Sequence, residues 1–426
     1  MHDDVTPVRS ARTLLWLLLA AAVVRGGWVC LQQARGVGLL FPDEFEYWRV
    51  AESIAAGRGL VDEFGFRATY MPLYPAFLAL FVKLPHGLLL ARLAQAAVGA
   101  AAVVPVFMLA RRLSPDPRAA VLAGLLVALD PFLVFGLSHL MLTETIFTTL
   151  LATAIVLAWP THGRRPARPT ERDRQPAEAL AGRGGPPLGR ALAAGVAFAL
   201  CIYTRPSVAA FVPVWSVALV VTARSERRGL GPAIGMLLAT AALLTPWVIR
   251  NRVVLGRWRV LSTRSGISLY DGLGPRAAGG SDLAYTKSME EVRGLSEVEW
   301  DAFFTRESIR MARENPRRVL RLAGIKFLRT WSPVPNEPGS RTAVKMVASA
   351  GWMVLTLGMA TAGVFRRRRP RETLLLLLPA LYFTLLHMVY VGSVRYRVPT
   401  MPPIYVLSGW AVAGRAEERP SRGSDG

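Results

Sequence analysis

Long apolar segments separated by arginine-rich loops constrain this chain more than any other feature of its sequence. Hydrophobic residues make up 52% of its 426 residues, and the mean hydropathy is +0.33. A run of about 18 or more apolar residues can cross a bilayer as a helix. The sequence therefore predicts an all-α polytopic membrane protein with about ten transmembrane helices. The clear runs are residues 14–30, 88–110, 119–137, 142–159, 208–221, 232–249, 344–364 and 374–391, and the shorter ones are 191–203 and 404–412.

The charge distribution predicts the orientation of these spans. The chain has 51 Lys and Arg against 29 Asp and Glu, a formal net charge of +22. A basic chain can bind nucleic acid, but here the arginines lie in alternate short loops, as the positive-inside rule requires. We therefore expect a multi-pass protein of the bacterial plasma (inner) membrane, with both termini cytoplasmic and no nucleic-acid partner. The basic loops are at Arg111, Arg112 and Arg118, 164–190, 224–228 and 366–369.

The same pattern divides the chain into regions. Residues 161–189 are rich in Pro, Arg and Gly, which is typical of a disordered loop. Cys30 and Cys201 both lie in apolar spans, so we expect small core residues rather than a disulfide or metal pair. The predicted regions are an N-terminal transmembrane region (1–250) with a catalytic first outer loop (31–87) and a disordered cytoplasmic loop (161–189), an extracytoplasmic segment (251–342), C-terminal transmembrane helices (343–415) and a disordered tail (416–426).

The first outer loop contains an acidic helix. Asp43 is expected to cap it, with Glu46 at the third helical position, and Gly57 and Gly59 to end it. Asp43, Glu46 and Tyr47 then share one face. The apolar stretch at residues 71–82 is too short to span a bilayer and is expected to lie at its outer surface, as a second juxtamembrane segment.

The second outer segment is expected to contain two helices. Ser296 and Glu299 form a capping box that opens a helix ending near Asn315. Asn315 and Pro316 begin the next one, whose arginines alternate with apolar residues. This second helix is interpreted either as interfacial, against lipid headgroups, or as an ordinary amphipathic helix.

Two acidic positions are candidate catalytic residues. Asp43, on the outer face of a strongly basic chain, suits a general base or a ligand for a divalent cation; alternatively, it only caps its helix. Its neighbour Glu44 is interpreted as a substrate contact or as a solvated surface charge. Glu144 lies at the outer end of an apolar span, where ionisable groups are costly and usually functional; alternatively, it faces a water-filled vestibule without a role. Asp130 is expected to form a turn.

Arginines at the outer ends of spans form the third group. The positive-inside rule disfavours them there, so Arg205, Arg250 and Arg395 each need a reason. A guanidinium binds phosphate bidentately, which suits an anionic lipid headgroup, and the alternative is snorkelling. Arg25, inside the first span, is expected to pair with an outer carboxylate.

Carboxylates and arginines on one membrane face favour group transfer from a lipid phosphate, because an acid can activate the acceptor while arginines stabilise the departing phosphate. Two other functions remain open. A secondary transporter or lipid flippase would place its coupling residues near the bilayer midplane, and a polysaccharide polymerase or ligase would use the same lipid-linked sugars. Convergence of Asp43, Glu144 and Arg395 at one face would favour the enzyme over the transporter.

Four stretches resemble the GT-C membrane glycosyltransferases, specifically the bacterial family 39-like relatives of protein O-mannosyltransferases and lipid A aminoarabinose transferases. They are PDEFEY (42–47) with MPLYP (71–75), LTET (142–145), TPWVIRN (245–251) continuing to Gly266, and RYRVP (395–399) with Pro402. The order of these stretches is more specific than any one of them.

The resemblance implies a polyprenyl-phosphate sugar donor, an outer-face active site, inversion at the sugar carbon and an acceptor protein, lipid or glycan. The family's loop aspartate maps onto Asp43 and its second carboxylate, often Asp, onto Glu144. Some relatives have a basic residue before the Pro-x-Tyr-Pro stretch, where this chain has Tyr70 and Met71 and Arg67 is the substitute. A divalent cation is possible but not asserted. The expected substrate-binding residues are Glu44, Tyr47, Arg67, Tyr74, His139, Arg205, Arg250, Asn251, Arg395, Tyr396 and Arg397.

Overall fold

The computed structural model describes residues 7–160, 186–223, 226–337 and 341–414. Within these ranges the regular structure is helical and no strand is present, as the sequence predicts. The α-helices are α1 (Pro7–Ala34), α2 (Pro42–Ala55), α3 (Leu73–Ala79), α4 (Gly87–Ala101), α5 (Val103–Leu113), α6 (Pro117–Leu129), α7 (Glu144–Ala158), α8 (Leu188–Thr204), α9 (Phe211–Thr222), α10 (Glu226–Leu255), α11 (Ser265–Leu273), α12 (Glu297–Glu314), α13 (Pro316–Thr330), α14 (Ala343–Arg367), α15 (Pro370–Val389), α16 (Val394–Arg397) and α17 (Met401–Val412).

The helices account for every predicted span, so the chain is a multi-pass membrane protein. Shorter apolar helices cover Glu144–Ala158, Leu188–Thr204 and Pro206–Thr222, and α17 packs against α14 and α6. Among the described residues, six helical segments are long and apolar enough to cross a membrane: Ser10–Ala34, Gly87–Leu113, Pro117–Leu137, Gly229–Leu255, Ala343–Arg367 and Pro370–Val389.

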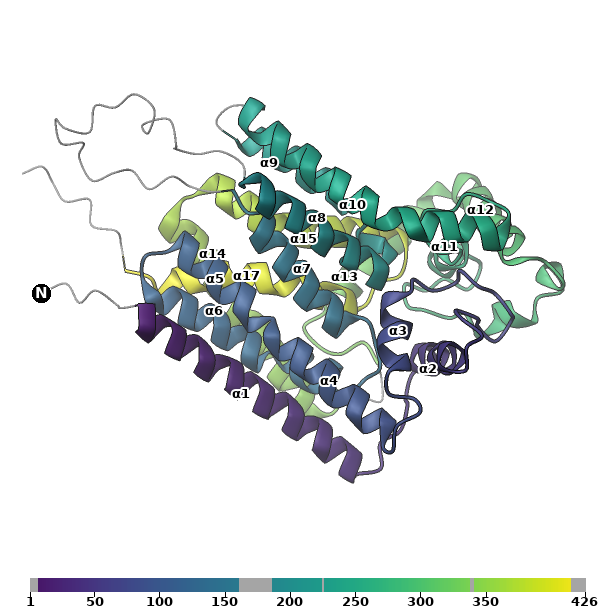
Figure 1. Cartoon of the computed structure of the whole chain (residues 1–426), viewed down its shortest axis with the longest axis horizontal. Coiled ribbons are helices and arrows are strands. Elements are labelled where there is room, and N and C mark those ends of the chain that lie inside the picture. Colours follow the sequence, from purple (N-terminus) through teal and green to yellow (C-terminus); the bar gives the residue numbers. More distant parts are fainter. Residues whose placement is uncertain (1–6, 161–185, 224–225, 338–340, 415–426) are drawn as a thin grey trace, which may run out of the picture.

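The long helices lie side by side, and α2, α3, α11 and α12 gather at one end of the bundle (right in Figure 1). We call this the covered end. The long helix α10 runs toward it from the bundle (Figure 1). Along the chain, any two of the predicted outer loops are separated by an even number of membrane crossings. The outer loops therefore all lie at this same end of the bundle.

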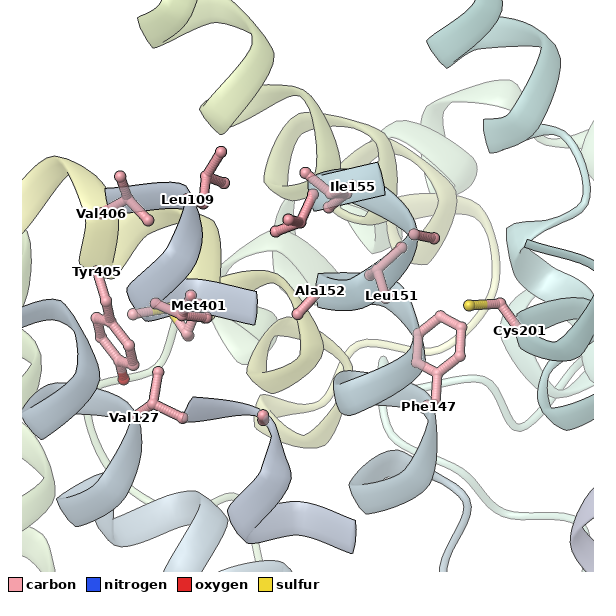
Figure 2. Close-up of a cluster of buried hydrophobic side chains, with 14 of the residues drawn as sticks. Leu109, Val127, Phe147, Leu151, Ala152, Ile155, Cys201, Met401, Tyr405 and Val406 are labelled. Carbon is pink, nitrogen blue, oxygen red and sulfur yellow. The ribbon is translucent and has the colours of Figure 1, made fainter. Parts of the chain in front are cut away.

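The core of the bundle is built from apolar side chains of α5, α6, α7, α8 and α17. Figure 2 shows Phe147, Leu151 and Ile155 of α7 between Cys201 on one side and Met401 on the other. Cys201 is fully buried, as predicted for a core residue. The same prediction is wrong for Cys30, which is exposed on α1.

Local sequence signals set the helix ends of the second outer segment. The Ser296 side chain accepts from the Glu299 amide and the Glu299 carboxylate accepts from the Ser296 amide, so the predicted capping box is confirmed. Asn315 caps α13, with Pro316 as its first residue. One face of α13 packs on α15 and α11, while Leu320 and Leu328 remain exposed.

Two predicted regions fall largely outside the described residues. The loop 161–189 is described only from residue 186, and α8 already begins at Leu188, inside its predicted end. The predicted tail 416–426 and Arg224 lie outside the described ranges.

Candidate functional site

The start of α2 is fixed by Glu44 rather than by Asp43. Glu44 is fully buried, and its Oε2 accepts from the amides of Leu40 (2.8 Å) and Phe41 (2.9 Å). Its Oε1 accepts from the amide of Met141 at 2.7 Å, in the turn before α7. Phe41 is the N-cap, so the predicted cap role of Asp43 is wrong, as is the interpretation of Glu44 as a surface charge. Glu44 joins the acidic helix to the turn that carries Glu144.

Arg395 brings the two candidate catalytic carboxylates together. Its Nη2 lies 2.9 Å from Glu144 Oε1 and 3.3 Å from Asp43 Oδ2, and its Nε donates to Glu144 at 3.0 Å. Asp43 comes from α2, Glu144 from the first turn of α7 and Arg395 from α16. Three segments far apart in the sequence therefore meet at the covered end.

A second arginine shares the buried carboxylate. Arg205 Nη1 lies 2.9 Å from Glu144 Oε1, and its guanidinium stacks over the Tyr396 ring at 5.2 Å. The Tyr396 ring in turn stacks on His387 at 4.0 Å between centroids. This ring pair fixes the plane on which Arg205 rests, and a cation over an aromatic face is itself stabilised.

Arg264, which was not among the predicted site residues, completes the network. It lies in the residue just before α11 and pairs with Glu46 at 2.8 Å and with Asp43 at 3.8 Å. It also contacts the Tyr70 hydroxyl, which donates to Glu46. The sequence signal for Arg264 was its position between Ser262 and Gly266, in a segment that carries the family resemblance. Sequence reasoning missed it because it lies away from the ends of the predicted spans, where the other candidate arginines lie.

The outer part of this network stabilises ionised side chains. Burial alone would raise the pKa of Glu46, but Arg264, Tyr70 and Lys287 outweigh burial, and its pKa is lowered. The same pairing raises the pKa of Arg264 despite the opposing effect of burial. Both groups are therefore charged at neutral pH and hold each other in place.

Exposure separates the roles of the two central carboxylates. The side chain of Glu144 is 0% exposed and that of Asp43 is 40% exposed. The arginines between them are partly exposed. A ligand can therefore reach Asp43 and the guanidinium groups, whereas Glu144 acts by orienting Arg205 and Arg395. We name Asp43, Glu46, Glu144, Arg205, Arg264 and Arg395 the charge network.

Tyr47 and Tyr74 line the base of the charge network without a polar contact to it. Tyr47 packs edge-on against Tyr70 and Tyr74 at 5.1 and 5.0 Å. The Tyr74 hydroxyl donates to Gln95 at 2.7 Å and is fully buried. Tyr74 is therefore a buried packing residue between α2 and α3, and a ligand cannot reach its side chain.

The other predicted binding residues hold local structure. His139 accepts from Trp28, Asn251 donates to the Arg259 carbonyl, and Arg397 donates to the carbonyls of Thr330 and Ser332. Arg250 donates to Asn251 and stacks on Trp247. None of these four side chains contacts the charge network, and their role in substrate binding stays a prediction.

Of two further predictions, one is untested and one is corrected. The side chain of Arg67 is exposed and its main-chain amide donates to Glu297, so its role as the basic residue beside the Pro-x-Tyr-Pro stretch stays a prediction. Arg25 does not pair with Asp43 or Glu144. It donates to the carbonyls of Val127 and Ala128 at 2.7 and 3.0 Å. Among the described residues, no group of three or more His, Cys, Asp or Glu is placed to hold a metal ion.

Comparisons with known proteins found matches among solved structures alone. No family model matches the chain, and no curated protein sequence matches it. Four chains of solved structures match. Among them are ArnT from Cupriavidus metallidurans in the apo state (TM-score 0.38, 15% identity, 96% of this chain and 77% of that chain) and the same protein bound to undecaprenyl phosphate (TM-score 0.36, 14% identity, 95% and 77%). At these scores the site assignment rests on the contacts described above.

Proposed function

We propose that this protein is an integral-membrane glycosyltransferase that moves a sugar from a polyprenyl-phosphate donor to an acceptor at the extracytoplasmic face. One observation carries the proposal: an exposed carboxylate, Asp43, is paired with two partly exposed arginines beside a third, at one end of an apolar helical bundle. A lipid-linked phosphate needs a bilayer path for its tail and cations for its headgroup. The apolar bundle is suited to the lipid tail, and the arginines are suited to the phosphate headgroup.

The chemistry follows from the positions of these groups. The acceptor hydroxyl attacks the anomeric carbon of the sugar while its proton passes to the Asp43 carboxylate. The bond between that carbon and the phosphate oxygen breaks, and the oxygen keeps the electron pair. Arg205, Arg264 and Arg395 stabilise the charge that develops on the departing phosphate, because they are already oriented by Glu144 and Glu46. Attack from the face opposite the phosphate inverts the anomeric carbon.

The convergence of these groups also bears on the transporter alternative. Coupling residues of a secondary transporter lie near the bilayer midplane on broken helices. Here Asp43 and Arg264 belong to the elements that cover the end of the bundle. This placement favours an enzyme acting at a membrane face.

The test uses the purified full chain in nanodiscs with radiolabelled polyprenyl-phosphate hexoses and pentoses and a membrane extract as the source of acceptor. The wild-type protein is expected to release polyprenyl phosphate and label an acceptor. Asp43→Asn should lower that rate by about 10²–10⁴-fold, the usual contribution of a general base, without changing the unfolding temperature.

Asp116→Asn is the matched control. Asp116 caps α6 with the same residue type and is remote from the charge network, and Asn caps nearly as well. Its rate should equal that of the wild type. A wild-type protein that consumes none of the donors, or an Asp43→Asn variant within threefold of wild type, would contradict the proposal.

A further inference from the structure

A recess of about 640 Å³, its open mouth included, adjoins the charge network. Glu46, Tyr70 and Arg264 line it and also belong to, or contact, the network. Its other walls come from the loop after α2 and from the segment around α11 and α12. Asp43 does not line the recess itself, but Arg264, which does, pairs with Asp43 at 3.8 Å. A molecule held in the recess therefore lies beside the candidate base, with Arg264 between them.

One wall of the recess is aromatic. Phe64 and Phe66 pack against Trp300 with ring centroids 5.4 and 5.2 Å apart. Asp62 holds the loop in this shape by accepting from the amides of Phe64 and Phe66 and from the Thr69 hydroxyl. Phe64 is nonetheless 44% exposed in a polar segment. The electron-rich face of such a ring attracts weakly positive C–H groups, which sugar rings present on their apolar faces.

The charged residues that line the recess balance one another, and one of them, Lys287, lies over the Phe64 ring at 5.5 Å. Three carboxylates, Glu46, Asp62 and Glu63, line the recess with three cations, Arg49, Arg264 and Lys287. Arg49 pairs with Glu63 at 2.5 Å, and Lys287 bridges Glu63 and Glu46. A balanced wall gives no net attraction to an anion, unlike the side of the network where two arginines share Glu144. It offers both donors and acceptors to hydroxyl groups.

We propose that this recess is the acceptor site and that the acceptor is a neutral saccharide. Resting on the proposed function, the inference adds the class of molecule that receives the sugar. One ring of the acceptor packs on the wall of Phe64 and Trp300, its hydroxyls exchange hydrogen bonds with Glu63 and Lys287, and the reacting hydroxyl faces Asp43 past Arg264. Aromatic rings beside balanced donors and acceptors favour a saccharide, which presents apolar C–H faces and several hydroxyl groups on one small ring.

The test measures binding without turnover. The full chain in nanodiscs is examined by saturation-transfer NMR with maltose, lactose and α-1,6-mannobiose, and with a neutral Ser- and Thr-containing peptide. We expect at least one disaccharide to bind through its C–H protons. Phe64→Ala should weaken that binding by about tenfold, the effect of losing one aromatic face, and Glu63→Gln should weaken it through lost acceptors.

Phe45→Ala is the matched control, because Phe45 is similarly exposed at 47% but lies outside the recess; binding should be unchanged. Asp43→Asn should keep saccharide binding while losing transfer. A wild-type protein that fails in the transfer assay but binds a saccharide through Phe64 would overturn the proposed function and leave a saccharide-binding site without an acceptor role. Absence of binding to all three disaccharides, equal binding by Phe64→Ala and wild type, or Phe64-dependent binding of the peptide alone would overturn the acceptor proposal.

Discussion

Two clusters of charge in this protein differ in how their charges are neutralised. Inside the bundle, Arg25 donates to the carbonyls of Val127 and Ala128, and Asp130 accepts from two backbone amides and the Tyr405 hydroxyl. The side chains of Arg25, Asp130 and Tyr405, which we call the interior cluster, are almost fully buried. At the covered end, by contrast, carboxylates and guanidinium groups from five segments pair with one another.

The comparison distinguishes structural from reactive charge. A buried charge that is satisfied by fixed backbone groups has no capacity left for a ligand. In the charge network, Asp43 and the arginines stay partly exposed and can exchange partners. Partial exposure together with mutual pairing is thus what marks the network as a binding site, since the interior cluster contains the same residue types.

Apart from the loss of the candidate base Asp43, the largest effect should come from Arg264→Lys. Lysine keeps the charge but cannot reach Asp43, Glu46 and Tyr70 at once. Transfer activity should fall by about 10²-fold, as when one donor to a developing anion is lost, while the unfolding temperature changes little. Arg310→Lys is the control, because Arg310 also spans two carboxylates, Glu307 and Glu314, but on the exposed face of α12. Equal activities of the two variants would remove Arg264 from the site.

A substitution in the interior cluster should lower the stability of the protein and leave its transfer activity unchanged, the reverse of the result expected for Arg264→Lys. Asp130→Ala leaves two buried amides and the Tyr405 hydroxyl without an acceptor, which costs about 1–3 kcal/mol of stability. The activity per folded molecule should remain within twofold of wild type. Thermal unfolding in nanodiscs and the transfer assay measure both quantities. A loss of activity in the folded fraction would mean that the two clusters are coupled, against the distinction drawn here.

The smallest expected effect is a pH dependence from Glu46. Its pKa in the folded protein is lowered from the ordinary value of 4.5, so the unfolded chain binds its proton first as the pH falls. The stabilisation is complete above about pH 4.5 and is lost as the pH falls through the lower, folded pKa. Thermal unfolding of wild type and Glu46→Gln between pH 6.5 and 3.5 should show a stability gap that narrows toward acid. If the difference in stability between the two proteins widens in acid instead, the folded protein does not lower the pKa of Glu46.

Most of the architecture could be predicted because it depends on local patterns. The spans follow from apolar length, and the start of α12 and of α13 follows from Ser296 with Glu299 and from Asn315 with Pro316. The convergence of Asp43, Glu144 and Arg395 was anticipated as a possibility from their common face of the membrane. Their contacts could not be predicted, since they depend on how three distant segments pack.

The errors have one physical origin. Asp43 was expected to cap α2, but Pro42 begins the helix and Glu44 reaches back to the amides before it. Arg250 and Arg397 carry the same guanidinium group as Arg205 and Arg395, yet the acceptors they contact are local amide and carbonyl oxygens. Residue type gives the capacity for a contact, and the neighbours decide which contact is made.

The sequence by itself determined that this chain is a helical membrane protein with its acidic and basic candidates on one face, because hydrophobic length and charge asymmetry act along the chain. Only the tertiary structure decided that Arg264 joins them, that Glu144 is buried while Asp43 is reachable, and that Phe64 and Trp300 form the wall of a recess beside them. Those properties arise from burial and from distances between segments as much as 352 residues apart, which no local pattern encodes.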